Sequence, residues 1–194
     1  MGYSIRADLA KEMDGQTKLH RFRYHLARGF VDIGDVVLDI GCGQGYGTKI
    51  IAPAASKVVS IDIDKDSIKV LQEENEFNHV SYIHADLEKT DLPDCDVACA
   101  FEVIEHLYTP LPFVMKLKKA TGKYICMSVP IGQKLVWIEE AKEYQEEHDS
   151  THHSAFPNME YVNKLFMDNQ WDIFYGFMHG PYYIAVYYNK ENIV

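Results

Sequence analysis

The sequence predicts an α/β fold of the Rossmann-like type, because strand-like and helix-like segments alternate from residue 36 onward. That alternation is typical of a parallel sheet with helices on both faces. Two further strand-like runs are separated by Gly180 and Pro181, which predicts an antiparallel hairpin at the C-terminal end of the sheet. We therefore expect a seven-stranded, mostly parallel sheet, with strands near residues 36–40, 57–61, 80–84, 96–101, 123–129, 173–178 and 182–188.

The segments between these strands are expected to be helical. Apolar side chains at helical spacing predict helices over residues 64–75 and 111–120, and residues 158–169 are expected to form the last helix. Residues 1–31 are predicted to form a helical cap ahead of the first strand. Residues 131–157 are too long for a plain connection, so they are a candidate substrate lid. The 194 residues are expected to form a single domain.

Composition limits the classes of function. The chain contains no apolar run long enough for a membrane span, and its mixed polar start does not resemble a signal peptide. A net charge of −10 argues against nucleic acid as a partner. The four cysteines form no C-x-x-C pair, so we expect free, buried thiols and a cytoplasmic location. A homodimer is compatible with the sequence.

A glycine-rich segment follows the first predicted strand and its acid, Asp39. The glycines occupy alternate positions: Gly41, Gly43, Gly45 and Gly47. The dinucleotide motif G-x-G-x-x-G fails in both registers, because Tyr46 or Thr48 stands where its third glycine belongs. The P-loop motif fails as well, because no Gly-Lys-Ser/Thr follows. What remains is a side-chain-free turn between a buried strand and a helix start, which is typical of a ligand-binding loop.

Two further acids follow the second and third predicted strands. Asp62 lies 21 residues after Gly41, close to the spacing of an acid that holds ribose hydroxyls in doubly wound folds. Asp64 lies beyond that strand and is predicted to be the N-cap of the next helix. Asp86 occupies the corresponding place after the third strand.

The order of these motifs resembles class I S-adenosylmethionine (SAM)-dependent methyltransferases. The run Phe101-Glu102-Val103-Ile104-Glu105-His106-Leu107 narrows the resemblance to the group with ubiquinone-type, sugar and polysaccharide O-methyltransferases. The resemblance implies SAM as cofactor, S-adenosylhomocysteine as product, and methyl transfer to a small-molecule or sugar-like hydroxyl. It implies cofactor contacts for Arg23, Asp39, Gly41, Gly43, Gly45, Asp62, Ile63, Asp86, Leu87 and Phe101.

The resemblance also assigns individual roles. Asp86 is expected to accept a hydrogen bond from the adenine amino group, and Arg23 to reach the cofactor carboxylate. A hydroxyl acceptor needs a general base, for which His106 is the first candidate and His153 the second. Glu105 is expected to lie beside them at the catalytic site.

Two alternatives stay open. Glu102, Glu105 and His106 also resemble small-RNA 3′-terminal 2′-O-methyltransferases, in which these residues and a later histidine bind a divalent metal. Here the later histidines are His148, His152 and His153. The spacing from His153 to Phe156 departs from that family, and acidic residues crowd the segment before it, so we assign no metal. The second alternative is a SAM-binding protein without catalysis.

Overall fold

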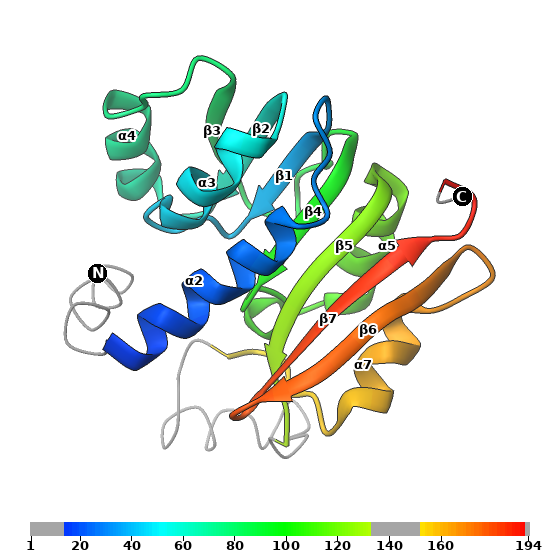
Figure 1. The fold of residues 1–194 in the computed structure, drawn as a ribbon. Helices are drawn as coiled ribbons and strands as arrows, with labels where there is room; N and C mark the ends of the chain where they lie inside the picture. Colours follow the sequence, from blue (N-terminus) through cyan, green and yellow to red (C-terminus); the bar gives the residue numbers. More distant parts are fainter. Residues whose placement is uncertain (1–13, 133–151, 193–194) are drawn as a thin grey trace. The chain divides into compact units, whose positions relative to one another are not determined.

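The computed structural model describes residues 14–132 and 152–192, and it contains a seven-stranded sheet of order β3-β2-β1-β4-β5-β7-β6 (Figure 1). The predicted sheet is therefore confirmed. The chain divides into two compact units, Met1–Cys99 (unit 1) and Ala100–Val194 (unit 2); the single domain expected from the length stays a prediction. Within the described residues, no helix is both long and apolar enough to cross a membrane.

Unit 1 contains three parallel strands whose registers bring their carboxyl ends together. Its elements are α2 (Asp14–Arg28), β1 (Val36–Ile40), α3 (Tyr46–Ile51), η1 (Ala52–Ala54), β2 (Lys57–Asp62), α4 (Lys65–Glu73), β3 (Val80–His84) and most of β4 (Cys95–Phe101). Ile40 pairs with Ile61, and Asp62 pairs with His84. Loops that leave β1, β2 and β3 therefore start at the same edge of the sheet.

The helices of unit 1 agree in part with the predicted ones. Asp64 is the N-cap of α4, as predicted, and its side chain accepts hydrogen bonds from the backbone N–H groups of Asp66 and Ser67. The helix ends at Glu73, two residues earlier than predicted. Of the predicted N-terminal cap, α2 forms one helix, and residues 1–13 lie outside the described residues. All four cysteines of the chain are free and buried, as expected.

Unit 2 ends in the predicted hairpin. Its elements are η2 (Ile104–His106), α5 (Pro110–Ala120), β5 (Thr121–Pro130), α7 (Met159–Phe166), β6 (Trp171–His179) and β7 (Tyr182–Asn189). Gly180 makes the turn between β6 and β7 with a φ of 60°, a conformation that glycine adopts without strain. β7 pairs antiparallel with both β5 and β6, so it is the inserted antiparallel strand.

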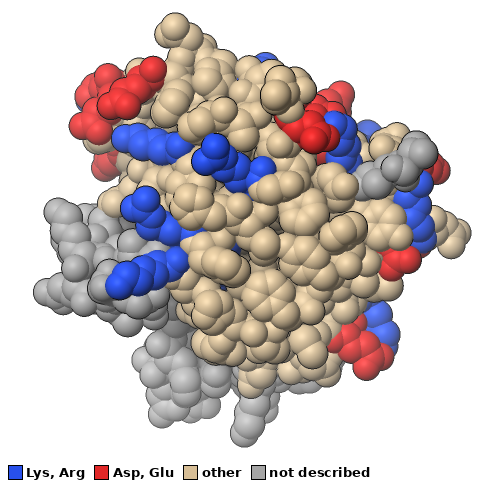
Figure 2. Space-filling model, viewed as in Figure 1, with Lys and Arg blue, Asp and Glu red and all other residues tan. Residues whose placement is uncertain are grey.

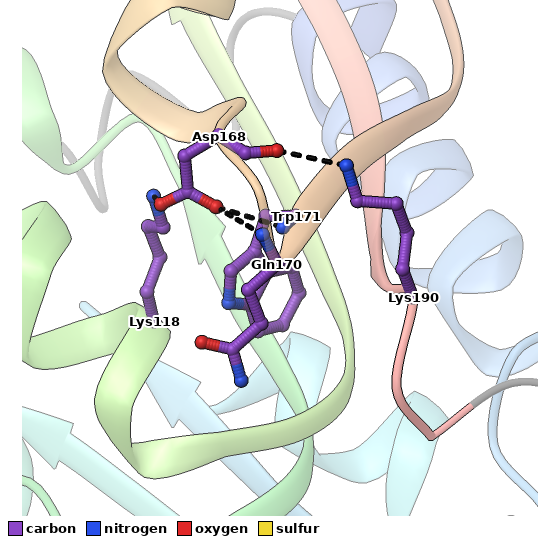
Figure 3. A network of polar contacts seen from close by, with 5 residues as sticks. All are labelled: Lys118, Asp168, Gln170, Trp171 and Lys190. Atoms are coloured by element: carbon purple, nitrogen blue, oxygen red, sulfur yellow. Dashed lines mark hydrogen bonds and ion pairs between the residues drawn. The ribbon is translucent and has the colours of Figure 1, made fainter.

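The last helix is shorter than predicted because a polar turn ends it. Asp168 accepts hydrogen bonds from the backbone N–H groups of Gln170 and Trp171, and its side chain forms an ion pair with Lys118 (Figure 3). Lys190 donates to the Asp168 carbonyl oxygen at 2.8 Å. This network fixes the chain reversal, so the next strand begins at Trp171.

Candidate functional site

The glycine loop of unit 1 folds back onto the end of β2. Gly41, Gly43 and Gly45 have φ values of 69°, 51° and 73°, a region that disfavours residues with a Cβ atom. The N–H groups of Gly41 and Cys42 both donate to the Ile61 carbonyl oxygen, at 2.8 Å and 3.2 Å. Alternating glycines thus allow one carbonyl at the end of β2 to anchor the loop.

The space around the loop differs from glycine to glycine. A Cβ atom on Gly45 would lie 2.5 Å from Leu71 Cδ2, and one on Gly47 would lie 2.1 Å from the Tyr24 ring. A Cβ atom on Gly43 would meet no atom within 4 Å. Packing against the Tyr24 ring therefore requires Gly47, and the positive φ favours glycine at position 45. Gly43, in contrast, leaves space beside its backbone for a ligand. This open stretch fits a cofactor that packs on the loop.

Asp62 connects the loop to the start of the next turn. Its two carboxylate oxygens accept hydrogen bonds from the N–H groups of Gly43 and Asp64, each at 2.8 Å. A carboxylate offers about four acceptor positions, so these two bonds orient the group and leave it able to accept ligand hydroxyls. The side chain is half-buried at the edge where Gly43 is open.

The residues that follow β2 and β3 lie at the same end of the sheet. They include both apolar and acidic side chains. Ile63 is 54% exposed, while Leu87 is buried. The Asp86 carboxylate accepts a hydrogen bond from the Glu88 N–H at 3.0 Å and pairs with Lys89 at 2.7 Å. Asp86 is therefore a turn cap, and its expected contact with adenine stays a prediction.

Asp39 lies beneath the loop. It has no exposed surface, and it accepts hydrogen bonds from the hydroxyl groups of Tyr24 at 2.9 Å and Thr48 at 2.6 Å. Burial raises the pKa of the Asp39 carboxyl to about 6, although both hydrogen bonds act in the opposite direction. Asp39 thus joins β1 to α2 and α3. The sequence did not single out Tyr24 and Thr48 for this role, because their hydroxyls meet Asp39 only in the folded chain.

Arg23, on α2, is completely buried. Arginine is rarely buried unless it has a charged or polar partner, so this position is not that of an ordinary surface helix residue. Its expected contact with the cofactor carboxylate stays a prediction.

In unit 2, Glu102, the first residue after β4, adopts an uncommon backbone conformation. Among the described residues, Glu102 is the one non-glycine with a positive φ, 57°. Its N–H donates to the Ser128 carbonyl oxygen at 3.0 Å, and its carboxylate accepts from the Ser128 hydroxyl at 2.8 Å. Such a conformation costs on the order of 1–3 kcal/mol and often marks functional segments. Phe101, which precedes it, is buried.

Glu105, His106 and His152 form one cluster. Each offers one ligand atom, and these atoms all lie within 4.8 Å of one another. Glu105 has no exposed surface, and the two imidazole rings meet edge to face with centroids 4.8 Å apart. The backbone holds the two segments together, because the N–H groups of His153 and Ser154 both donate to the Glu105 carbonyl oxygen, at 2.7 Å and 2.9 Å.

His153 lies differently from His152. Its ring stacks on Tyr108 with centroids 3.9 Å apart. The structure therefore brings together two of the predicted catalytic residues, Glu105 and His106, and adds His152 to them. The sequence offered no signal to choose between adjacent histidines, nor any to single out Tyr108. His148 and most of the predicted lid lie outside the described residues.

Comparison with known proteins agrees with these motifs. The family called "Methyltransferase domain" matches residues 38–123. A probable SAM-dependent methyltransferase of Mycobacterium tuberculosis is 38% identical over 80 residues, 40% of this chain. The mitochondrial ubiquinone biosynthesis O-methyltransferase of Schizosaccharomyces pombe is 30% identical over 105 residues, 50% of this chain and 38% of its own length. Ribosomal RNA small subunit methyltransferase A of Levilactobacillus brevis is 31% identical over 152 residues, 70% of this chain and 51% of its own.

Each of these sequence matches covers only part of the relative. The chain spans 28% of the length of the Mycobacterium tuberculosis protein. The fold agrees over a larger share. Magnesium protoporphyrin IX methyltransferase from Synechocystis, solved with bound S-adenosylhomocysteine, superimposes with a TM-score of 0.61 at 18% identity, over 81% of this chain and 75% of that one. Residues 38–123 thus match a methyltransferase domain, and the motifs, the relatives and the fold support a class I SAM-dependent methyltransferase, with SAM as cofactor.

Proposed function

We propose that the protein transfers a methyl group from SAM to the hydroxyl of a small-molecule or sugar-like acceptor. The observation that carries the proposal is the open glycine loop with Asp62 hydrogen-bonded to Gly43, since this pair fits the donor. The S. pombe relative, whose name describes an O-methyltransferase, supports oxygen as the acceptor atom.

The donor site belongs to unit 1 in this proposal. SAM supplies a methyl group on a sulfonium, whose leaving group is a neutral thioether. Asp62 accepts hydrogen bonds from the ribose hydroxyls, because hydrogen bonds to an ionised carboxylate are stronger than neutral ones. Ile63 and Leu87 contact the adenine ring, and Asp86 accepts from its amino group. Arg23 binds the cofactor carboxylate, and the contact of Phe101 with the cofactor stays an expectation from the family resemblance.

The residues that we propose to act on the acceptor belong to unit 2. His106 accepts the hydroxyl proton as the oxygen bonds to the methyl carbon, and Glu105 orients the His106 imidazole. The proximity of the two side chains supports these roles, because their ligand atoms lie within 4.8 Å of each other. His153 stays a second candidate base, held by its stacking on Tyr108.

Formation of S-adenosylhomocysteine tests the proposal. The wild-type protein is incubated with labelled SAM and a panel of sugars, nucleotide-sugars, quinols and short RNAs. We expect turnover with a hydroxyl-bearing small molecule. SAM binding without turnover of any acceptor would instead favour the SAM-binding protein without catalysis.

We infer a second candidate function, a metal-dependent methyl transfer to an RNA hydroxyl, because one observation favours it. A carboxylate and two imidazoles are ligands that suit Zn²⁺ or Mn²⁺. Ligands about 2.1 Å from an ion stand at most about 4.2 Å apart, so the Glu105, His106 and His152 cluster needs only a small contraction. The L. brevis relative, named for ribosomal RNA, supports RNA as the acceptor.

Two adjacent histidines separate the candidates. If the cluster holds a metal, His152→Ala lowers Zn²⁺ or Mn²⁺ affinity and activity together, whereas His153→Ala keeps the metal. If no metal is used, chelation leaves activity unchanged, and His152→Ala has a smaller effect than His106→Ala. Elemental analysis of the purified protein provides the readout that does not depend on activity.

Finally, we propose a cytoplasmic location, which the four free cysteines support because reduced thiols are typical of that compartment.

A further inference from the structure

Ser128 is a buried polar residue in an apolar part of the sheet. It lies near the carboxyl end of β5 and has no exposed surface, and its neighbours Met127 and Val129 are also completely buried. A buried hydroxyl group costs free energy unless it forms a hydrogen bond. An apolar side chain would avoid this cost, so we looked for a role of Ser128 other than packing.

The hydroxyl and the carbonyl group of Ser128 both contact Glu102. The carbonyl oxygen accepts a hydrogen bond from the Glu102 N–H at 3.0 Å, and the hydroxyl donates to the Glu102 carboxylate at 2.8 Å. Hydrogen bonds to an ionised carboxylate are stronger than neutral ones. The strand that carries Ser128 lies inside the sheet, between β4 and β7. Ser128 therefore holds the main chain and the side chain of Glu102 from a well-supported position.

Glu102 is a residue that needs such support. The acidic side chains visible in Figure 2 lie at the surface, where water solvates them, whereas Glu102 is partly buried. Its φ of 57° lies in the left-handed region, which glycine adopts without strain. A strained residue persists only where the surrounding structure fixes it. The two hydrogen bonds from Ser128 provide such a constraint.

The conformation of Glu102 determines the course of the turn that follows it. β4 ends at Phe101, and the backbone becomes helical at Val103, with a φ of −120° and a ψ of −51°, directly before η2. The His106 N–H donates to the Val103 carbonyl oxygen at 3.0 Å. The proposed base is thus hydrogen-bonded to the residue that follows Glu102.

The same turn also holds the segment of the second histidine. The Glu105 carbonyl oxygen accepts hydrogen bonds from the N–H groups of His153 and Ser154. A displaced turn would move Glu105 and, through these bonds, the segment that contains His152. The position of the cluster therefore depends on the first residue of the turn, Glu102.

We propose that Ser128 is a positioning residue for methyl transfer, because it fixes Glu102 and thereby sets the place of His106 at the acceptor. The inference rests on the proposed function, in which His106 accepts the hydroxyl proton. Ser128 itself does not touch the reacting atoms. A general base works only within hydrogen-bond reach of the proton that it removes, so a small displacement of the turn lowers the rate without changing SAM affinity.

Ser128→Ala tests the side-chain bond, because alanine keeps the backbone carbonyl and loses the hydroxyl. We expect kcat for formation of S-adenosylhomocysteine to fall about tenfold or more, since misplacement of a reacting group is costly. The Kd of SAM, measured by calorimetry, should stay unchanged. Thr121→Val is the matched control, because it removes another buried hydroxyl of β5, one that donates to the Leu117 carbonyl oxygen. It should keep the wild-type kcat.

Variants of Glu102 test whether the bond itself carries the effect. Glu102→Ala should lower kcat, and Glu102→Gln should restore part of it, because the amide oxygen of glutamine can still accept from the Ser128 hydroxyl. Effects of residues in contact are not additive, so the double variant Ser128→Ala/Glu102→Ala should be no slower than Glu102→Ala alone. Additive losses, or equal rates for Glu102→Gln and Glu102→Ala, would overturn the proposal.

Amide hydrogen exchange provides a readout that needs no turnover. The His106 N–H, which donates to the Val103 carbonyl oxygen, reports on the turn. Ser128→Ala should speed its exchange about tenfold, the effect of one lost hydrogen bond to a charged group, and Thr121→Val should not. Circular dichroism checks that each variant is folded.

Unchanged kcat or unchanged exchange in Ser128→Ala overturns the proposal. A wild type that turns over no acceptor counts against the proposed function alone, and the exchange rate of the His106 N–H then decides the role of Ser128.

Discussion

The glycine loop of unit 1 and the cluster of Glu105, His106 and His152 in unit 2 are built in different ways. The loop is held by backbone N–H groups, which donate to the Ile61 carbonyl oxygen and to the Asp62 carboxylate. The cluster consists of side chains from two segments that are far apart in the sequence. In the proposed function, donor recognition therefore depends on backbone shape, whereas acceptor chemistry depends on which side chains meet.

The two regions also differ in how they use burial. In unit 1, the buried carboxyl of Asp39 is satisfied by two hydroxyl groups and supports the loop from beneath. In unit 2, the buried Glu105 is one of the three groups that carry the proposed chemistry. A buried acid thus supports the structure in the first region and, in the proposed function, takes part in the chemistry in the second.

The largest effect is expected from His106→Ala, which removes the proposed base. General base catalysis contributes about 10²- to 10⁴-fold, so the catalytic rate should fall by at least about a hundredfold. SAM affinity should stay unchanged, because the donor residues other than Phe101 belong to unit 1. Steady-state kinetics and calorimetry measure the two quantities.

His25→Ala is the control for this experiment, because His25 is an exposed histidine of α2. It should keep the wild-type rate. Equal kinetics for His106→Ala and the wild type would remove His106 from the mechanism.

Asp39 should make the stability of the protein depend on pH. Its pKa is about 6 in the folded protein, above the unfolded value near 3.9. Between these values the folded state binds more protons, so the free energy of unfolding falls as pH rises from about 4 to about 6. The contribution is fully present below pH 4, and a shift of about two units corresponds to about 3 kcal/mol.

Asp39→Asn cannot ionise, so its stability should lack this slope. Urea unfolding of both proteins between pH 4 and pH 7 measures the difference between them, from which the other titrating groups cancel. A constant difference across that range would contradict the raised pKa.

Gly47→Ala should break the packing that supports the loop. The added Cβ atom would lie 2.1 Å from the Tyr24 ring, which is buried. Overpacking of this kind costs about 1–3 kcal/mol of the free energy of unfolding, and chemical denaturation measures it. Gly29→Ala is the control, since its Cβ atom meets only the Leu26 carbonyl oxygen, at 3.2 Å. Equal losses in the two variants would argue against a special role for Gly47.

The smallest of these effects concerns Asp62. Asp62→Ala removes the proposed ribose contacts and should weaken SAM binding about tenfold or more, the loss of one or two hydrogen bonds to a charged group. Calorimetry measures the affinity. Asp64→Ala is the matched control, because it removes the N-cap of α4 and should cost about 1 kcal/mol of stability with little change in SAM affinity. Unchanged binding by Asp62→Ala would exclude the ribose assignment.

The sequence by itself determined the features that depend on short-range backbone rules. The alternation of strand-like and helix-like segments predicted the seven strands. Asp64 was identified as an N-cap, and Gly180 and Pro181 as the turn of the hairpin. The glycine loop was located for the same reason, since its positive φ values require glycine within a few residues of a strand end.

Only the tertiary structure decided which side chains meet. Tyr24 and Thr48 reach Asp39 because α2 and α3 pack on β1, and His152 rather than His153 joins His106 because backbone bonds to Glu105 set the phase of that segment. Adjacent side chains of an extended segment point to opposite sides. Their orientation therefore depends on contacts between distant segments, and no local pattern in the sequence records those contacts.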